Sequence, residues 1–119
     1  LHSFLQYYRA QEKQMAIGSA AIRENVDFVL DGCDIRSYFD AIVSADDVTK
    51  SKPDPETFLL CAQRLGVDAV QSLVFEDTPK GVECAVNAGM PTVVILTTHE
   101  EEEFEAYAPW IVDYIHDYK

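Results

Sequence analysis

Short apolar segments alternate with amphipathic segments along this chain. Apolar residues that recur at helical spacing predict helices, and brief continuous apolar runs between turn residues predict strands. By this criterion helices are expected over 1–13, 21–33, 55–66 and 78–89. Strands are expected over 14–19, 41–44, 72–76 and 91–96.

Helix ends are marked by proline and glycine. Pro55 stands where the first position of a helix is expected, Gly66 stands just after the end of that same helix, and Gly89 stands just after the end of the next one. The helix over 21–33 should end near Gly32. Its inward face is expected to contain Ile22, Val26, Val29 and Leu30.

These alternating elements predict an α/β fold. Short strands that are apolar on both faces and separated by helices are typical of a parallel sheet with helices on both sides. We therefore expect one doubly wound, Rossmann-like domain over 1–119. The acidic segment 99–110 is interpreted as a solvated helix face, and 111–119 is too short to assign.

Composition narrows the possible partners and location. The net charge of -12 would repel a phosphate backbone, so nucleic acid is not expected as a partner. No apolar run approaches the length of a membrane span, and no signal segment is visible. Cys33, Cys61 and Cys84 form no close pair, and we interpret them as small buried residues in a reducing compartment, the cytoplasm.

Four candidate side chains follow predicted strands. Ser19 follows the first strand, Lys52 ends the loop after the second, and Glu76 and Asp77 follow the third. Ligands of parallel sheets gather at the carboxyl ends of the strands, so these groups should lie at one edge. Two carboxylates suit a divalent cation, and a hydroxyl and an ammonium suit phosphate oxygens. The set is a workable arrangement for phosphoryl chemistry.

Each candidate also has a structural interpretation. Ser19 could cap a helix, Lys52 could be a solvated loop residue, and Asp77 could cap the helix that follows it. Asp46 and Asp47 also follow a strand, but two aspartates in a short loop are more often turn residues. The shared position at successive strand ends favours a functional site over independent structural roles.

Three segments resemble signature motifs of the haloacid dehalogenase superfamily, in its β-phosphoglucomutase and sugar-phosphatase branch. They are "AIGSA", "SKPDPETF" and "VFEDTPKGVECAVNAGM", and the resemblance extends over nearly all of 1–96. It implies a Mg²⁺-dependent phosphatase or phosphomutase that acts on small phosphorylated sugars through an aspartyl-phosphate.

The resemblance also implies roles for single residues. Ser19 and the backbone N–H of Ala20 would bind the transferring phosphoryl group, and Lys52 would neutralise its charge. Glu76 and Asp77 would hold Mg²⁺. Arg23 stands where a contact to the substrate phosphate could occur, although a charged residue in a first helical turn is usually solvated.

The chain departs from the family pattern in what it lacks. The family begins with a D-x-D-G segment on its first strand, which supplies the nucleophile, and no D-x-D occurs here. The cap domain is also absent, and the chain begins at Leu1. We therefore interpret 1–119 as a single partial core domain, inactive alone. The alternative is a non-catalytic module that binds Mg²⁺ and phosphate or another protein. A phospho-receiver domain fits less well, because receivers have no K-P-D-P loop.

The missing first strand affects the sheet. The family's order places it between the strand that ends at Ser19 and the strand that ends at Glu76. The sheet is thus expected to be incomplete, with a gap filled by a missing N-terminal segment or by another chain. The alternative is direct pairing of the two flanking strands.

Overall fold

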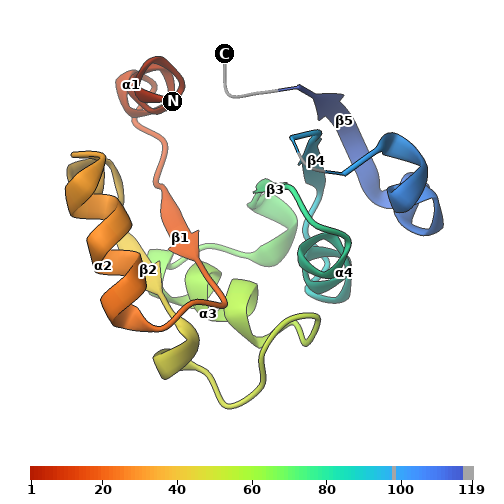
Figure 1. Cartoon of the computed structure of the whole chain (residues 1–119), viewed down its shortest axis with the longest axis horizontal. Helices are drawn as coiled ribbons and strands as arrows, with labels where there is room; N and C mark the ends of the chain where they lie inside the picture. Colours follow the sequence, from red (N-terminus) through yellow and green to blue (C-terminus); the bar gives the residue numbers. More distant parts are fainter. Residues whose placement is uncertain (98, 117–119) are drawn as a thin grey trace.

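Parallel strands form two separate sheets in the computed structural model, which describes residues 1–97 and 99–116 (Figure 1). The first sheet pairs β1 (Ala16–Gly18) with β2 (Ala41–Val43). The second has the order β3 (Val74–Glu76), β4 (Thr92–Ile95), β5 (Ile111–Ile115). All pairings are parallel, which confirms the predicted α/β class.

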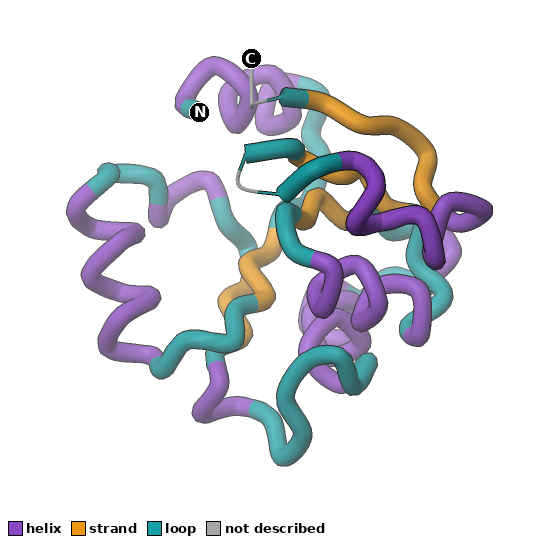
Figure 2. Tube along the Cα trace, turned by 45° about the vertical axis from the view of Figure 1, so that its right-hand side comes forward, coloured by secondary structure: helices purple, strands orange, loops and turns teal. Residues whose placement is uncertain are grey.

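Helices and helical turns connect the short strands (Figure 2). The α-helices are α1 (His2–Ala10), α2 (Arg23–Gly32), α3 (Glu56–Leu65) and α4 (Pro79–Asn87). Short 3₁₀ turns cover Arg36–Tyr38, Ala45–Asp47 and Ala69–Gln71, and a longer 3₁₀ segment covers Glu101–Trp110. The predicted elements are thus all present. Of the segment 111–119, which was too short to assign, Ile111–Ile115 forms β5, and 117–119 lie outside the described residues.

Helix ends follow local sequence. Gly66 and Gly89 have φ of 70° and 75°, the left-handed region that glycine enters without steric cost, and each stands just beyond a helix. Pro79 is the first residue of α4, where its missing N–H costs nothing. Pro55 precedes α3 by one residue as its N-cap, so its predicted place was off by one position.

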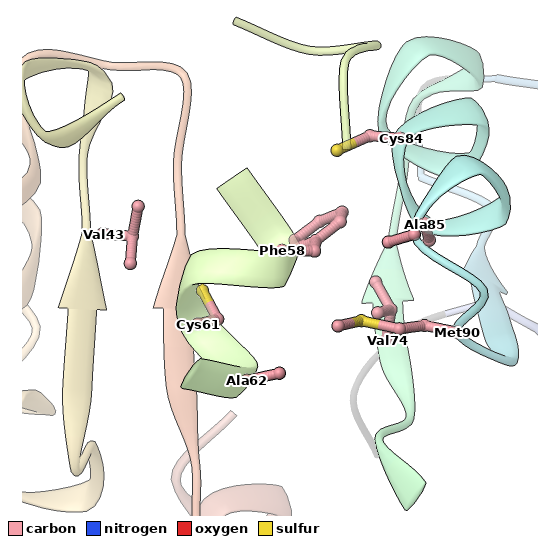
Figure 3. Packing of buried hydrophobic residues seen from close by; sticks show 9 residues of the cluster. Val43, Phe58, Cys61, Ala62, Val74, Cys84, Ala85 and Met90 are labelled. Carbon is pink, nitrogen blue, oxygen red and sulfur yellow. The ribbon is translucent and has the colours of Figure 1, made fainter. Parts of the chain in front are cut away.

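The largest core cluster joins the two sheets through α3. Figure 3 shows side chains of α3 between the strands β1 and β2 on one side and β3 and α4 on the other. The cluster contains Val43, Phe58, Cys61, Ala62, Val74, Cys84, Ala85, Ala88 and Met90. Because α3 packs against both halves, it fixes their relative position in the described part of the chain.

Some predicted core positions were wrong. Val29 is 54% exposed and Ile22 48% exposed, because α2 meets the core through Val26 and Leu30 only, which lie one turn apart on a narrow stripe. Cys33 is exposed at the end of α2, whereas Cys61 and Cys84 are buried as expected.

The acidic segment 99–110 has the predicted solvated face, but its helix is of a different type from the α-helices. It winds as a 3₁₀ helix, and Phe104 is fully buried against Val82 of α4 and Val94 of β4. No helix in the described ranges is long and apolar enough to cross a membrane.

The strands β1 and β3 belong to different sheets and do not pair with each other. Among the described residues no ladder joins them, which confirms the predicted interruption of the sheet and excludes direct pairing of the flanking strands in this structure. Part of the space next to β3 is covered by α1, because the ring of Phe4 lies 4.9 Å from that of Phe75, centroid to centroid.

Candidate active site

Lys52 connects the two sheets at the carboxyl ends of their strands. It lies in the loop between β2 and α3, before a cis bond to Pro53. Its Nζ donates to the Gly18 carbonyl at 3.1 Å and to Glu76 Oε2 at 2.9 Å. The ammonium also lies 4.4 Å from the ring centroid of Phe58. With a side chain only 12% exposed, Lys52 is not the solvated loop residue of the structural interpretation.

Glu76 ends β3 with both carboxylate oxygens engaged. Its Oε2 pairs with Lys52, and its Oε1 accepts from the Asp77 backbone N–H at 3.0 Å and from Thr78 Oγ1 at 3.4 Å. The side chain is 11% exposed. A carboxylate held this way is fixed in orientation at the sheet edge, as a ligand or charge-positioning group must be.

Asp77 is not the cap of α4, so the capping interpretation was wrong. Thr78 caps the helix, because its Oγ1 accepts from the backbone N–H of Gly81 at 3.1 Å. Proline at position 79 sets where the first turn begins, and this makes residue 78 the N-cap. Within the described residues the Asp77 carboxylate has no hydrogen bond or ion pair, so it is free to bind a ligand.

Ser19 follows β1 and adjoins the carbonyl that Lys52 contacts. Its Oγ accepts from the backbone N–H of Ala21 at 3.0 Å, which forms a local turn two residues long. The N-cap of α2 is Ile22, so the capping interpretation of Ser19 was also wrong. Ala20 is exposed beside it. Ser19, Ala20, Lys52 and the acidic pair therefore follow strand ends on the same edge of the fold.

Arg23 is held elsewhere in this structure. Its guanidinium lies 3.4 Å from Asp27 and 3.7 Å from Asp47, and its Nη1 donates to the Ile42 carbonyl of the outer strand β2. No described contact joins it to Lys52 or Glu76. A role for Arg23 at a substrate phosphate stays a prediction.

Asp46 and Asp47 are turn residues, as interpreted from the sequence. Asp47 forms a capping box with Ser44, and the hydrogen bond from the Ser44 backbone N–H lowers the pKa of Asp47. Asp46 accepts from the Arg23 backbone N–H. Both carboxylates thus stabilise the loop after β2.

Two neighbours of Lys52 were not foreseen. The Gly18 carbonyl and the Phe58 ring both contact the ammonium in addition to Glu76. No sequence signal marks a backbone carbonyl as a ligand. The sequence predicts Phe58 as a core residue because it lies on the apolar face of α3. Only the packing reveals that its ring also contacts the Lys52 ammonium.

Glu76 and Asp77 have the donor chemistry that Mg²⁺ prefers. Mg²⁺ takes oxygen ligands in an octahedral arrangement and commonly uses one or two carboxylates together with water and phosphate. No group of three or more acidic, histidine or cysteine side chains suited to a metal exists in the described part of the chain. The two carboxylates thus fit part of a coordination sphere and leave the rest to other ligands.

Comparison with known proteins identifies relatives of this chain. The family of haloacid dehalogenase-like hydrolases matches residues 1–95. Fructose-1-phosphate phosphatase YqaB of Escherichia coli is 46% identical over 81 residues, which cover 68% of this chain and 43% of that protein. The phosphorylated carbohydrates phosphatase of Thermotoga maritima is 34% identical over 89 residues, covering 75% of this chain and 41% of that protein.

Solved structures give the same result for the fold. The β-phosphoglucomutase of Clostridium difficile superposes with a TM-score of 0.79 at 27% identity, over 87% of this chain and 44% of that one. The chain spans about half the length of the curated relatives it matches, for example 43% and 41% of the two phosphatases. What these relatives share with the chain is one part of a larger fold.

Proposed function

The chain belongs to the haloacid dehalogenase-like hydrolases, which include the sugar-phosphate phosphatases among its relatives. On this premise we propose that it is the core portion of a Mg²⁺-dependent phosphatase or phosphomutase for small phosphorylated sugars. The observation that carries the proposal is the Lys52 ammonium, held between the Gly18 carbonyl and Glu76 Oε2. A fixed, part-buried cation beside Ser19 suits the charge of a transferring phosphoryl group.

The phosphoryl group would be bound by residues in the loops that follow the two strands of the first sheet. Ser19 Oγ and the Ala20 backbone N–H would donate to its oxygens, and Lys52 would neutralise its charge. Catalysis of phosphoryl transfer consists mainly of positioning and charge stabilisation, so a cation held in advance lowers the cost of reaching the transition state. A substrate phosphate would make Arg23 leave its aspartates, which is a further step of the proposal.

Glu76 and Asp77 would hold the Mg²⁺ ion. A bound Mg²⁺ supplies positive charge that stabilises the developing charge on phosphate oxygens. Because Glu76 also pairs with Lys52, the residues that would hold the ion and the ammonium that would neutralise the phosphate are in direct contact.

The nucleophile would come from outside this chain. The resemblance implies an aspartate on a strand between β1 and β3, and the two unpaired edges there support such a strand. Either an N-terminal segment or another chain would complete the sheet, and the aspartyl-phosphate would form on it. The protein would work in the cytoplasm, where its free cysteines stay reduced.

Phosphorylated sugars are the proposed substrates because of the relatives. One acts on fructose 1-phosphate and another on phosphorylated carbohydrates, by their names. The net charge of -12 gives a small anionic metabolite no general attraction, so affinity would have to arise locally at Lys52 and Mg²⁺.

A non-catalytic module remains the second candidate. It is favoured by one observation: the described residues contain two site carboxylates and no third acidic group that could act beside them. Such a module would bind Mg²⁺ and phosphate, or a partner protein, without turnover.

One experiment separates the two candidates. The full-length protein that carries this chain is assayed for phosphate release from a panel of sugar phosphates, with Mg²⁺ and with excess chelator. Mg²⁺-dependent release that Lys52→Ala abolishes, and that Lys50→Ala leaves intact, would support the enzyme. Absence of release from the whole panel, with Mg²⁺ binding retained, would replace it with the module.

A further inference from the structure

Gly81 lies in the first turn of α4, next to the carboxylate of Glu76. Its backbone is helical, since Gly66 and Gly89 are the described glycines with positive φ. Inside a helix, glycine is less favourable than alanine because it retains more freedom in the unfolded chain. Backbone geometry therefore gives no reason for a glycine at this position.

A side chain at position 81 would collide with Glu76. A Cβ atom added there would overlap Cδ, Cγ and Oε2 of Glu76, at distances well under the 3.0 Å that real Cβ atoms respect. The obstacle is the acidic side chain itself. Glu76 thus occupies the volume that any larger residue at 81 would need.

Because it occupies this volume, the Glu76 carboxylate can contact Lys52 with one oxygen and the start of α4 with the other. From here Oε2 reaches Lys52 Nζ, while Oε1 accepts from Asp77 N–H and Thr78 Oγ1. The Thr78 hydroxyl in turn accepts from the Gly81 N–H. The carboxylate also lies at the positive end of the α4 dipole, which favours its charge.

We propose that Gly81 is a positioning residue for Glu76: its missing side chain leaves the volume in which the carboxylate contacts Lys52 and from which it would serve as a Mg²⁺ ligand. The consequence for Mg²⁺ rests on the proposed function. The steric claim does not, because it concerns two residues of this chain alone. A displaced carboxylate would leave Lys52 with the Gly18 carbonyl as its remaining polar partner in the described structure.

The first test compares two glycine variants of the full-length protein. Gly81→Ala should lower the thermal midpoint of unfolding, because Glu76 must leave its place. Gly32→Ala is the matched control: Gly32 ends α2, has helical backbone, and would have nothing within 4 Å of an added Cβ. The control should leave the midpoint unchanged or raise it.

The second test identifies Glu76 as the obstacle. In a Glu76→Ala background the collision is gone, so Gly81→Ala should raise the midpoint through better helix propensity. This reversal of sign distinguishes the proposal from general crowding. If Gly81→Ala alone does not fold, the double variant Glu76→Ala/Gly81→Ala is still expected to fold. An equal loss from Gly81→Ala in both backgrounds would overturn the proposal.

The third test measures metal binding without turnover. Mg²⁺ titration by calorimetry should show about a tenfold or greater rise in the dissociation constant for Gly81→Ala, as for other changes that misplace a ligand. Gly32→Ala should bind as the wild type. Unchanged Mg²⁺ affinity in Gly81→Ala would overturn the positioning role. Wild-type protein that binds no Mg²⁺ would instead contradict the proposed function and leave the sign reversal as the test of the steric claim.

Discussion

Lys52 Nζ lies 2.9 Å from Glu76 Oε2, and this ion pair joins one sheet to the other where no ladder of backbone hydrogen bonds does so in the described structure. Both side chains are nearly buried, at 12% and 11% exposure. Charges in such a place are costly when unpaired. The pair is therefore a structural connection between the halves of the fold as well as the centre of the candidate site.

Removing the ammonium should destabilise the fold. Lys52→Met leaves the Glu76 carboxylate without its partner, and we expect a loss of about 2–3 kcal/mol in the free energy of unfolding, below the value for a fully buried pair. Urea denaturation measures it. The exposed Lys50→Met is the control and should change stability little.

The double variant Lys52→Met/Glu76→Gln sharpens this test. Neutralising both partners removes the unpaired charge, so most of the lost stability should return. A double variant as unstable as Lys52→Met alone would mean that packing of the lysine stem, and not its charge, stabilises this region.

Asp77 and Thr78 should separate metal binding from helix capping. Asp77→Asn should remove most Mg²⁺ affinity with little change in stability, because Thr78 caps α4. Thr78→Val should instead cost about 1 kcal/mol of stability through the lost cap, a loss that Asp77→Asn does not share. Calorimetric titration and urea denaturation of both variants decide the matter. Retained Mg²⁺ affinity in Asp77→Asn would exclude Asp77 as a ligand.

The sequence predicts the elements well because their signals are local. Apolar runs and helical spacing locate the strands and helices, and Gly66 and Gly89 mark helix ends through their own backbone freedom. The predictions that were wrong concern nearby residues of similar chemistry, between which the sequence does not choose. Asp77 and Thr78 can both cap a helix, and only the start of α4 decides between them. Val29 and Val26 are both apolar, and only the packing partner of α2 selects Val26.

The candidate site could be predicted in part for the same reason. The rule that ligands of a parallel sheet bind at the carboxyl ends of its strands assigns Ser19, Lys52 and Glu76 to one sheet edge. It gives no information about the Gly18 carbonyl or the Phe58 ring, since these contacts depend on how α3 packs against β1. Arg23 shows a different limit, because one of its two charge partners, Asp47, comes from a loop that the sequence pattern treats as a simple turn.

Catalysis should depend on Lys52 and on a group outside the chain. The 119-residue chain alone should release no phosphate from sugar phosphates, because no charge stabilisation replaces a missing nucleophile. In the full-length protein Lys52→Ala should lower kcat about 10²–10³-fold, as loss of a preorganised donor does. Lys50→Ala is the control. Robust Mg²⁺-dependent turnover by the mass-verified 119-residue chain would contradict the requirement for an external nucleophile.

Stability should fall in alkali because of Cys61. Burial raises the pKa of the Cys61 thiol from 9.0 to about 11. A raised folded-state pKa means that the unfolded chain loses its proton first, so stability is full below pH 9 and declines as pH rises toward 11. The loss should approach about 2–3 kcal/mol. In Cys61→Ala the decline between these pH values should be shallower, while the exposed Cys33→Ala should keep the wild-type slope.

Amide exchange should reveal the gap between β1 and β3. The Ser19 amide donates to Val43 and the Val74 amide to Pro91, so both point toward their own sheets. Backbone groups of successive residues in a strand point to opposite sides, which directs the amides of Gly18 and Phe75 into the gap.

In the 119-residue chain Gly18 and Phe75 should therefore exchange much faster than Ser19 and Val74. In the full-length protein a strand in the gap would pair with them and slow their exchange about 100-fold or more, since exchange then requires opening of the sheet. Strong protection of both amides in the 119-residue chain alone would contradict an open gap. Fast exchange of both in the full-length protein would contradict a strand that completes the sheet.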